Sequence, residues 1–306
     1  MVTYNQKIRQ QKRQDVDQVM NWFGRFSIHL VLIFFALCSL LPLVLIISSS
    51  LTDEKTLTRS GYNLIPQQFS TQAYDLILRS PGVILRAYAV TMFTTVLGTV
   101  VAVTLMSMLA YALSRPDFIL RKPLSFIVFF TMLFNGGIVP YYILMTQYLR
   151  VQDTVFAFLL PYFVVGFYVL ILRTYFASLP ADLIDAARVD GAGEFRIFIS
   201  IALPLAKPAL ATIALFTALN YWNDWTTALY FIRDSHLYPL QYLLYIIQSN
   251  VQAMQLQSAV GNIAVSDVPS QTTQLAMAVL ATGPAAIFFL FFQRYLVRGV
   301  TLGAFK

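Results

Sequence analysis

A group of charged residues between Asp185 and Pro204 interrupts a chain that is otherwise mostly apolar. Charges of both signs and a glycine occur there at close spacing. The charged residues in and beside it are Asp182, Asp185, Arg188, Asp190, Glu194, Arg196 and Lys207. This composition predicts a folded cytosolic element between two membrane spans. Taken alone, it is also compatible with an ordinary amphipathic connector.

The order of residues in this element predicts two short helices. Ser178 or Leu179 can cap the first helix, and Pro180 suits its first turn, where a missing N–H costs little. Gly191 supplies the left-handed residue that ends it. A second stretch runs to Leu203–Pro204 and has apolar residues at helical spacing. These residues are Phe195, Phe198, Ile199 and Ala202.

A second polar group falls inside a predicted span. Its members are Asn220, Trp222, Asn223, Asp224 and Trp225. An ionisable residue within a span is a candidate functional residue, and sugars are bound by planar hydrogen-bonding side chains together with aromatic faces. The group is therefore a candidate part of a solute path. The structural alternative, in which Asn and Asp side chains join helices across the bundle, stays open.

No residue pattern predicts catalysis or metal binding. An enzyme within the membrane would need paired acids or a His-x-x-x-His, and Asp224 has no acidic neighbour inside its span. His29 and His236 lie far apart in the sequence, so a shared metal is not expected. The single cysteine, Cys38, excludes an internal disulfide framework. The phosphate-binding pattern G-x-x-x-x-G-K-[ST] is absent.

The composition places these elements in a bilayer. Of 306 residues, 58% are hydrophobic and 11% are charged, whereas soluble domains carry roughly 25% charged residues. The net charge of +7 does not indicate nucleic acid, because Lys and Arg stand in small groups beside apolar runs. We expect an all-α membrane protein with six transmembrane helices. The candidate spans are 26–48, 87–113, 124–145, 154–176, 209–232 and 273–295.

The basic residues predict the orientation. With a cytosolic N-terminus, 15 of the 21 Lys and Arg residues fall on the inner side, and the positive-inside rule then places both termini in the cytosol. The expected organisation has five parts. They are a basic cytosolic segment (1–25), a first span (26–48), an extracytoplasmic loop (49–86), a five-helix core (87–295) with an inner loop (178–208) and an outer loop (233–272), and a cytosolic tail (296–306).

The outer loop 233–272 is rich in glutamine. Gln241, Gln248, Gln252, Gln255 and Gln257 stand among Leu, Tyr and Ile residues. This neutral polar pattern is suited to a weakly charged partner surface, and a solvated connector is an equal alternative.

The inner loop resembles a known signature. Asp185–Ala186–Ala187, then Gly191, then Ile201-x-Leu203–Pro204 match in every spacing the EAA motif of the permease subunits of binding-protein-dependent ABC importers. The extended form, with Asp190–Gly191–Ala192 and Pro208, is present as well. The one departure is Asp185, where the family usually has Glu. Asp keeps the charge and is one methylene shorter.

The resemblance covers about residues 87–294 and is greatest to the carbohydrate branch, within it to permeases for complex oligosaccharides such as aldouronates or alginate fragments. Three segments carry this similarity. They are Asn135–Gly136–Gly137, Tyr221–Trp222–Asn223–Asp224–Trp225 and the C-terminal stretch from Gly299 to Lys306.

The resemblance implies a type I ABC importer permease fold in which residues 180–204 form cytosolic coupling helices that sit in a cleft of an ATPase subunit. The residues expected to couple to the ATPase are Asp185, Ala186, Ala187, Arg188, Asp190, Gly191, Ala192, Ile201, Leu203 and Pro204. The implied partners are a second homologous permease subunit, an ABC ATPase dimer that binds ATP and Mg, and an extracytoplasmic solute-binding protein. The chain itself needs no cofactor, and it would lie as a multi-pass protein in a bacterial cytoplasmic membrane and pass an oligosaccharide.

Two alternatives remain at this point. One is an ABC importer permease for a non-sugar solute. The other is an ion-coupled secondary transporter, which would need inverted repeats or broken helices with ion-binding carboxylates. Prolines interrupt several spans, but no two halves of the sequence match.

Overall fold

The computed structural model describes residues 22–79, 81–261 and 271–302. Most of the expected basic N-terminal segment, the last four residues of the tail and residues 262–270 of the outer loop lie outside these ranges. Within them the chain is helical, with an isolated β-bridge between Thr52 and Phe69.

The helices follow one another without a sheet between them in the described ranges. They are α2 (Trp22–Ser50), α3 (Glu54–Ser60), α4 (Gln72–Leu78), α5 (Pro81–Ser114), α6 (Arg121–Leu133), α7 (Ile138–Ile143), η1 (Leu144–Tyr148), α8 (Val155–Leu159), η2 (Leu160–Tyr162), α9 (Gly166–Ala177), α10 (Ala181–Val189), α11 (Glu194–Ile197), η3 (Phe198–Ala202), α12 (Leu203–Leu205), α13 (Lys207–Trp222), α14 (Thr226–Phe231), η4 (Ser235–Leu237), α15 (Leu240–Gly261) and α16 (Gln271–Leu302).

Two unbroken helices, α2 and α5, are long and apolar enough to cross a membrane. Three bent pairs could each form one further span, so the described residues hold at most five candidates by this measure, against six expected. The bends are 115° between α6 and α7–η1, 49° between α8–η2 and α9, and 82° between α11–α12 and α13. The sixth expected span, 273–295, coincides with α16, and the side chains of its second half are not described.

Three of the expected spans, 124–145, 154–176 and 209–232, are interrupted in the structure. In 124–145 the break falls at Gly137, which has a φ of +82° and donates its N–H to the Asn135 side chain at 2.9 Å. The apolar composition that predicts this span does not indicate a turn. The Asn135–Gly136–Gly137 sequence within it can form one. The expected span 209–232 is divided at Asn223, where α13 ends before α14 begins at Thr226.

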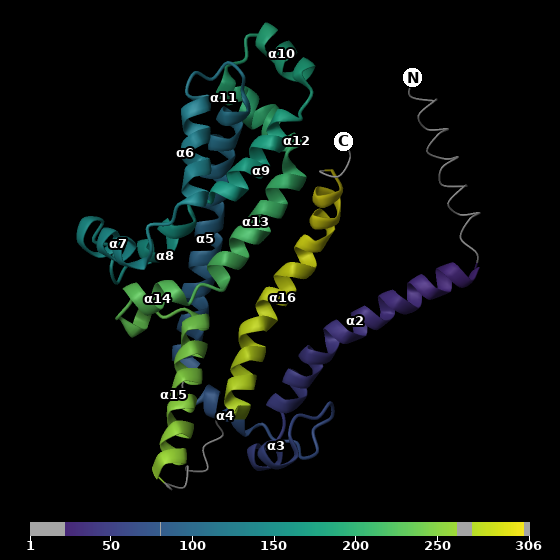
Figure 1. Ribbon diagram of the computed structural model, residues 1–306, viewed down its shortest axis with the longest axis vertical. Coiled ribbons are helices and arrows are strands. Elements are labelled where there is room, and N and C mark those ends of the chain that lie inside the picture. The colour runs from purple at the N-terminus through teal and green to yellow at the C-terminus, as the bar shows by residue number, and fades with distance from the viewer. Residues whose placement is uncertain (1–21, 80, 262–270, 303–306) are drawn as a thin grey trace.

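The long helix α5 forms the centre of the bundle, with α9 and α13 packed against it and α16 against α13 (Figure 1). The approach of α5 to α13 is close at Gly98, where an added Cβ would lie 2.5 Å from Cζ of Tyr221. Tyr221 is held in place, since its hydroxyl donates to the Leu159 carbonyl at 2.8 Å and its ring packs edge-on against Tyr162. Gly98 therefore permits this helix pair to form.

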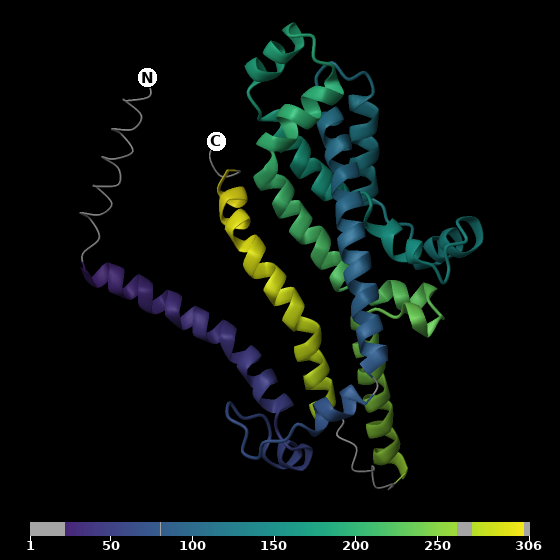
Figure 2. The same cartoon turned by 180° about the vertical axis from the view of Figure 1, so that it is seen from behind.

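Helix α2 stands apart from the bundle. Figures 1 and 2 show it meeting α16 near α3 and diverging toward its own N-terminus. In its most apolar stretch, 0% of the residues are buried. An all-round apolar helix with so little cover is suited to lipid or to another membrane subunit.

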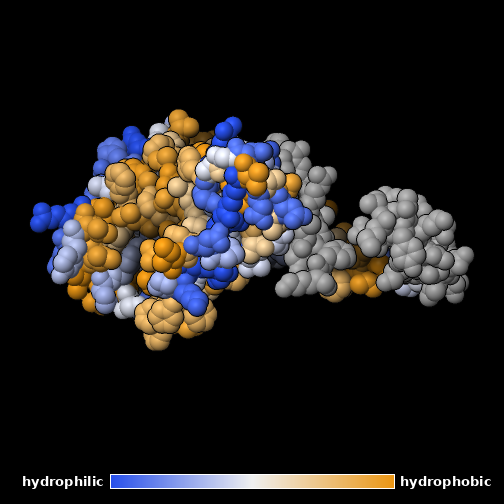
Figure 3. Space-filling model, turned by 90° about the horizontal axis from the view of Figure 1, so that it is seen from above, coloured by the Kyte–Doolittle hydropathy of each residue, from blue (hydrophilic) through white to orange (hydrophobic). Residues whose placement is uncertain are grey.

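The two ends of the bundle differ. At one end, α3 is attached to α16, because the Glu54 carboxylate accepts hydrogen bonds from the N–H groups of Gln271 and Thr272 at 3.0 and 2.9 Å. At the opposite end lie α10 and α11, and Figure 3 views the molecule from that side, with hydrophilic side chains gathered among hydrophobic ones.

Candidate functional site

The first helix of the charged element, α10, ends at Gly191. This residue has a φ of +79°, and its N–H donates to the Arg188 carbonyl at 3.0 Å. The N–H of Ala192 donates to the Ala187 carbonyl at 2.9 Å, so the helix closes with a left-handed cap. This confirms the prediction for Gly191. Pro180 lies at the N-cap, one position before the expected first turn, and neither Ser178 nor Leu179 caps the helix.

The second stretch consists of α11, η3 and α12, and it runs into α13 through an 82° bend at Ala206. The hydrogen bonds on the two sides of this corner meet at Ala206: its N–H donates to the Ala202 carbonyl at 2.9 Å, and its carbonyl accepts from the N–H of Leu210 at 2.9 Å. Pro208 has no N–H and cannot donate across the bend. Of the four apolar residues predicted to form one face, Phe198 and Ala202 are buried, whereas Phe195 and Ile199 are exposed.

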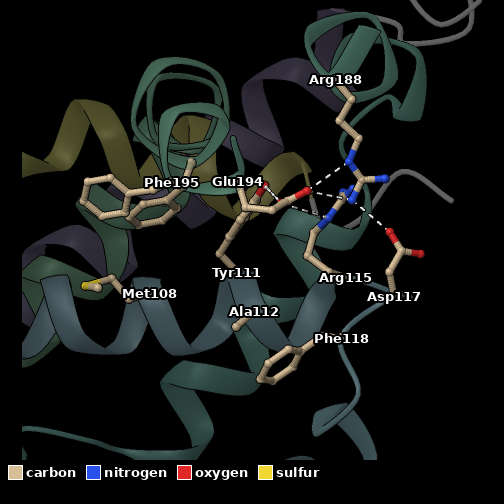
Figure 4. A pocket seen from close by; sticks show the side chains of 10 residues that line it. Met108, Tyr111, Ala112, Arg115, Asp117, Phe118, Arg188, Glu194 and Phe195 are labelled. Carbon is tan, nitrogen blue, oxygen red and sulfur yellow. Dashed lines mark hydrogen bonds and ion pairs between the residues drawn. The ribbon is translucent and has the colours of Figure 1, made fainter. Parts of the chain in front are cut away.

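A charged network centred on Arg188 ties α10 to its neighbours (Figure 4). One guanidinium nitrogen, Nη2, lies 2.8 Å from Asp117 in the loop between α5 and α6 and 2.7 Å from Glu194 at the start of α11. The other carboxylate oxygen of Glu194 accepts from the Tyr111 hydroxyl at 2.9 Å and lies 3.8 Å from Nε of Arg115. The network thus joins α10, the start of α11, the loop between α5 and α6, and the end of α5.

The charges in this network support one another. Burial alone would raise the pKa of Glu194, but hydrogen bonds from Arg188 and Tyr111 outweigh it and hold that pKa below its ordinary value. The same contacts with Glu194 and Asp117 raise the pKa of Arg188 above its ordinary value. Both groups therefore stay charged at neutral pH.

Beside the network lies a hollow of about 360 Å³. Its walls are largely apolar, and its rim carries the charged groups. The lining residues are Met108, Tyr111, Ala112, Arg115, Asp117, Phe118, Arg188, Glu194, Phe195 and Phe198. Such a hollow is shaped to receive an apolar side chain next to charged partners.

The residues expected to couple to an ATPase divide into two sets. Asp185, whose side chain is 68% exposed, faces solvent, and its nearest charged neighbour among the described residues is Arg188 at 4.0 Å. Ala186, Asp190, Gly191 and Pro204 are exposed as well. The inward set packs against the hydrophobic core. Its members are Ala187, Ala192, Ile201 and Leu203.

The sequence pattern did not reveal the partners of Arg188. Tyr111 is 83 positions from Glu194, and Asp117 is 71 positions from Arg188, so no local spacing joins them. One sequence feature could have pointed to Asp117. Arg115, Pro116 and Asp117 form a short charged loop that the predicted topology places on the same side of the membrane as Arg188.

The second predicted group does not converge on one point. Asp224 is 5% exposed and caps α14, since its Oδ1 accepts from the N–H of Thr227 at 3.0 Å. Trp222 is buried and donates its indole N–H to the Ala281 carbonyl at 3.1 Å.

The remaining members of the group lie elsewhere. Asn220 donates to the Tyr168 hydroxyl at 3.3 Å. Asn223 and Trp225 are directed toward α15, because Asn223 accepts from Gln241 at 3.3 Å and the Trp225 ring stacks on Tyr245.

The described part of the chain holds no group of three His, Cys, Asp or Glu residues able to bind a metal ion.

Comparison with known proteins adds the family context. A model of the family described as "Binding-protein-dependent transport system inner membrane component" matches residues 95–302. The chain is 38% identical over 278 residues to the polygalacturonan/rhamnogalacturonan transport system permease protein YtcP of Bacillus subtilis, covering 90% of this chain and 95% of the relative. It is 30% identical to the arabinooligosaccharides transport system permease protein AraQ of Halalkalibacterium halodurans, covering 89% of this chain and 93% of the relative.

A solved structure is similar over nearly the whole fold. It is a chain of a bacterial ABC transporter involved in the import of the acidic polysaccharide alginate. The match has a TM-score of 0.76 and 31% sequence identity, and it covers 89% of this chain and 96% of that one.

Proposed function

The chain belongs to the family of binding-protein-dependent transport system inner membrane components, and on this basis we propose that it forms half of the translocation path for an oligosaccharide and couples to a cytosolic ATPase through residues 180–204. It is a multi-pass permease subunit of an ABC importer in the cytoplasmic membrane, and ATP hydrolysis belongs to a separate subunit. The other half of the path is a second permease, and an extracytoplasmic binding protein delivers the solute.

One observation carries the coupling proposal: α10 presents Asp185 outward while Arg188, one turn later, is bound back to Asp117 and Glu194. A subunit that docks on this face therefore meets an element already attached to the loop between α5 and α6 and, through Glu194, to Tyr111 of α5. Exposed apolar side chains beside Asp185, namely Leu183, Val189 and Phe195, add surface that docking would remove from water.

The substrate class follows from the relatives. Their names specify transport of polygalacturonan or rhamnogalacturonan and of arabino-oligosaccharides, and the similar structure belongs to an alginate importer. An oligosaccharide is the solute that these share.

The orientation can be tested with single cysteines. Because Cys38 is the chain's one cysteine, Cys38→Ser gives a background into which Asp185→Cys or Gln248→Cys is introduced. A membrane-impermeant maleimide should label position 185 in inside-out vesicles and position 248 in right-side-out vesicles. The reverse pattern would contradict a cytosolic α10.

The function itself is tested by reconstitution. The chain, its partner permease, the ATPase and the binding protein are placed in proteoliposomes, and uptake of labelled oligosaccharide is followed with and without ATP. Uptake should require ATP, the ATPase and the binding protein together. Accumulation driven by an ion gradient without the ATPase would refute the proposal.

A further inference from the structure

The outer helix α15 carries a polar stripe on one face. Gln241, Tyr245, Gln248 and Gln252 follow one another at intervals of three or four residues, so they lie on the same side of the helix. Together with Trp225, from the break between α13 and α14, they line a hollow of about 350 Å³ (Figure 1 shows α14 beside the start of α15).

The aromatic rings of this hollow are ordered by contacts with one another. The rings of Trp225 and Tyr245 stack with centroids 4.5 Å apart at an interplanar angle of 20°, and Tyr242 lies nearly parallel to Tyr245 with a centroid distance of 6.1 Å. The side chain of Gln241 is held by its hydrogen bond to Asn223. A ligand therefore meets ordered rings, and less ordering entropy is lost on binding.

The chemistry of the lining residues selects the ligand. Glutamine amides each offer two N–H donors and a carbonyl acceptor, which suits hydroxyl groups that both donate and accept. Aromatic rings suit the C–H face of a pyranose ring, which is apolar. None of the described residues that line the hollow is charged, so none of them would neutralise a carboxylate.

We propose that the groove formed by Trp225, Tyr245, Gln241, Gln248 and Gln252 is a binding subsite for an uncharged sugar unit of the transported oligosaccharide. This inference rests on the proposed function and adds to it a location and a preference. In an oligosaccharide that mixes neutral and acidic sugars, the neutral unit occupies the groove and the uronate carboxylates lie outside it.

The first test measures transport in the reconstituted importer. The probes are oligosaccharides derived from rhamnogalacturonan, galacturonan and arabinan, each supplied with saturated binding protein. Trp225→Ala or Gln248→Ala should lower the rate of uptake of a probe that contains neutral units by about tenfold, the effect of losing one stacked ring or one hydrogen-bonded group. Trp225→Phe should retain most of the rate, and Asn250→Ala, an exposed residue of α15 outside the groove, should retain all of it.

The second test measures which sugar units contact the protein. Saturation-transfer NMR with the rhamnogalacturonan oligosaccharide and the permease complex in nanodiscs should transfer most strongly to the protons of the neutral rhamnose units. Trp225→Ala should abolish this difference. Equal or stronger transfer to the uronate units would overturn the proposed preference.

The outcomes separate the two proposals. If the wild-type importer takes up none of the probes, the proposed function and this inference fall together. If the wild type transports them and both groove variants match Asn250→Ala, the inference alone is refuted. If the groove variants instead weaken binding of the sugar-free binding protein to the complex, the groove is a protein-docking surface and the sugar subsite is refuted.

Discussion

Replacing Gly191 by alanine should uncouple the importer while leaving it folded. The left-handed backbone at this position closes α10 and sets the direction of the following stretch. The matched control is Gly193→Ala, two residues later in the same loop, where φ is −70°. A Cβ added at either glycine meets no atom within 4 Å, so the two substitutions differ in backbone conformation and not in steric contact.

The magnitude follows from that difference. An L-residue in the left-handed region costs about 1–2 kcal/mol. Both substitutions also restrict the unfolded chain, which stabilises each of them by about 0.4–1 kcal/mol and cancels in the comparison. The ratio of native to non-native loop should therefore be roughly 5- to 30-fold smaller in Gly191→Ala than in Gly193→Ala.

Proteoliposomes containing the complete importer provide the assay, with oligosaccharide uptake and ATP hydrolysis measured on the same sample. Gly191→Ala should lower the sugar taken up per ATP by up to that factor relative to Gly193→Ala, at an unchanged yield of membrane-inserted protein. Gly191→Asn should recover much of the loss, because asparagine enters the left-handed region more readily than alanine.

Equal coupling ratios for Gly191→Ala and Gly193→Ala would refute the role given to the left-handed cap. A fall in insertion or in thermal stability of Gly191→Ala alone would show that the loop contributes to folding and not to coupling.

Three further predictions concern single contacts. Asp185→Glu should preserve ATP-driven uptake. Asp185→Asn should weaken binding of the ATPase by about 2–5 kcal/mol, measured by co-purification, if the carboxylate pairs with a desolvated basic residue of the ATPase. Equal yields of ATPase for the two variants would exclude such a pair. Gly98→Ala should lower the thermal unfolding temperature, because the added methyl group overpacks against Tyr221 at a cost of about 1–3 kcal/mol. Gly82→Ala, in open space on the same helix, should leave that temperature unchanged. Matching unfolding temperatures for the two variants would contradict the close approach of α5 to α13. The pKa of Glu194 is lowered in the folded chain, so the stability that its charged carboxylate contributes is complete above the ordinary pKa of 4.5 and is lost as the pH falls through the lowered pKa. Hydrogen exchange of the α10 amides should accelerate over that pH range in the wild type. It should show no such pH dependence in Glu194→Gln.

The sequence predicted the left-handed end of α10 at Gly191 because its determinant is local, whereas the expected cap at Ser178 or Leu179 is wrong and two residues of the expected apolar face, Phe195 and Ile199, are exposed. A left-handed glycine, a proline at the start of α10 and the alternation of charged and apolar residues act within a few positions. The helical class and the membrane setting followed from composition, since too few charges are present to cover a water-facing surface of this size.

The interrupted helices and the anchoring network could not be predicted in the same way. Apolar periodicity is nearly the same for a straight span and for one that bends at Gly137 or Asn223, so periodicity alone does not locate the bend. The pairing of Arg188 with Asp117 joins residues that are distant in sequence, so only the fold brings them together. The same holds for Trp225, whose stacking partner Tyr245 lies on another helix.

The corner at Ala206 has a mechanical consequence. Since the hydrogen bonds of α12 end at Ala206 and those of α13 begin there, and Pro208 cannot donate across the bend, Ala206 is a hinge about which α13 can rotate. At 1.5 Å per residue, α13 is a lever arm of roughly 24 Å, so a rotation of about 10° at the corner displaces its far end by roughly 4 Å. That end is Trp222, three residues before Trp225 of the Trp225–Tyr245 stack, so a rotation of α13 about Ala206 would also displace the aromatic groove.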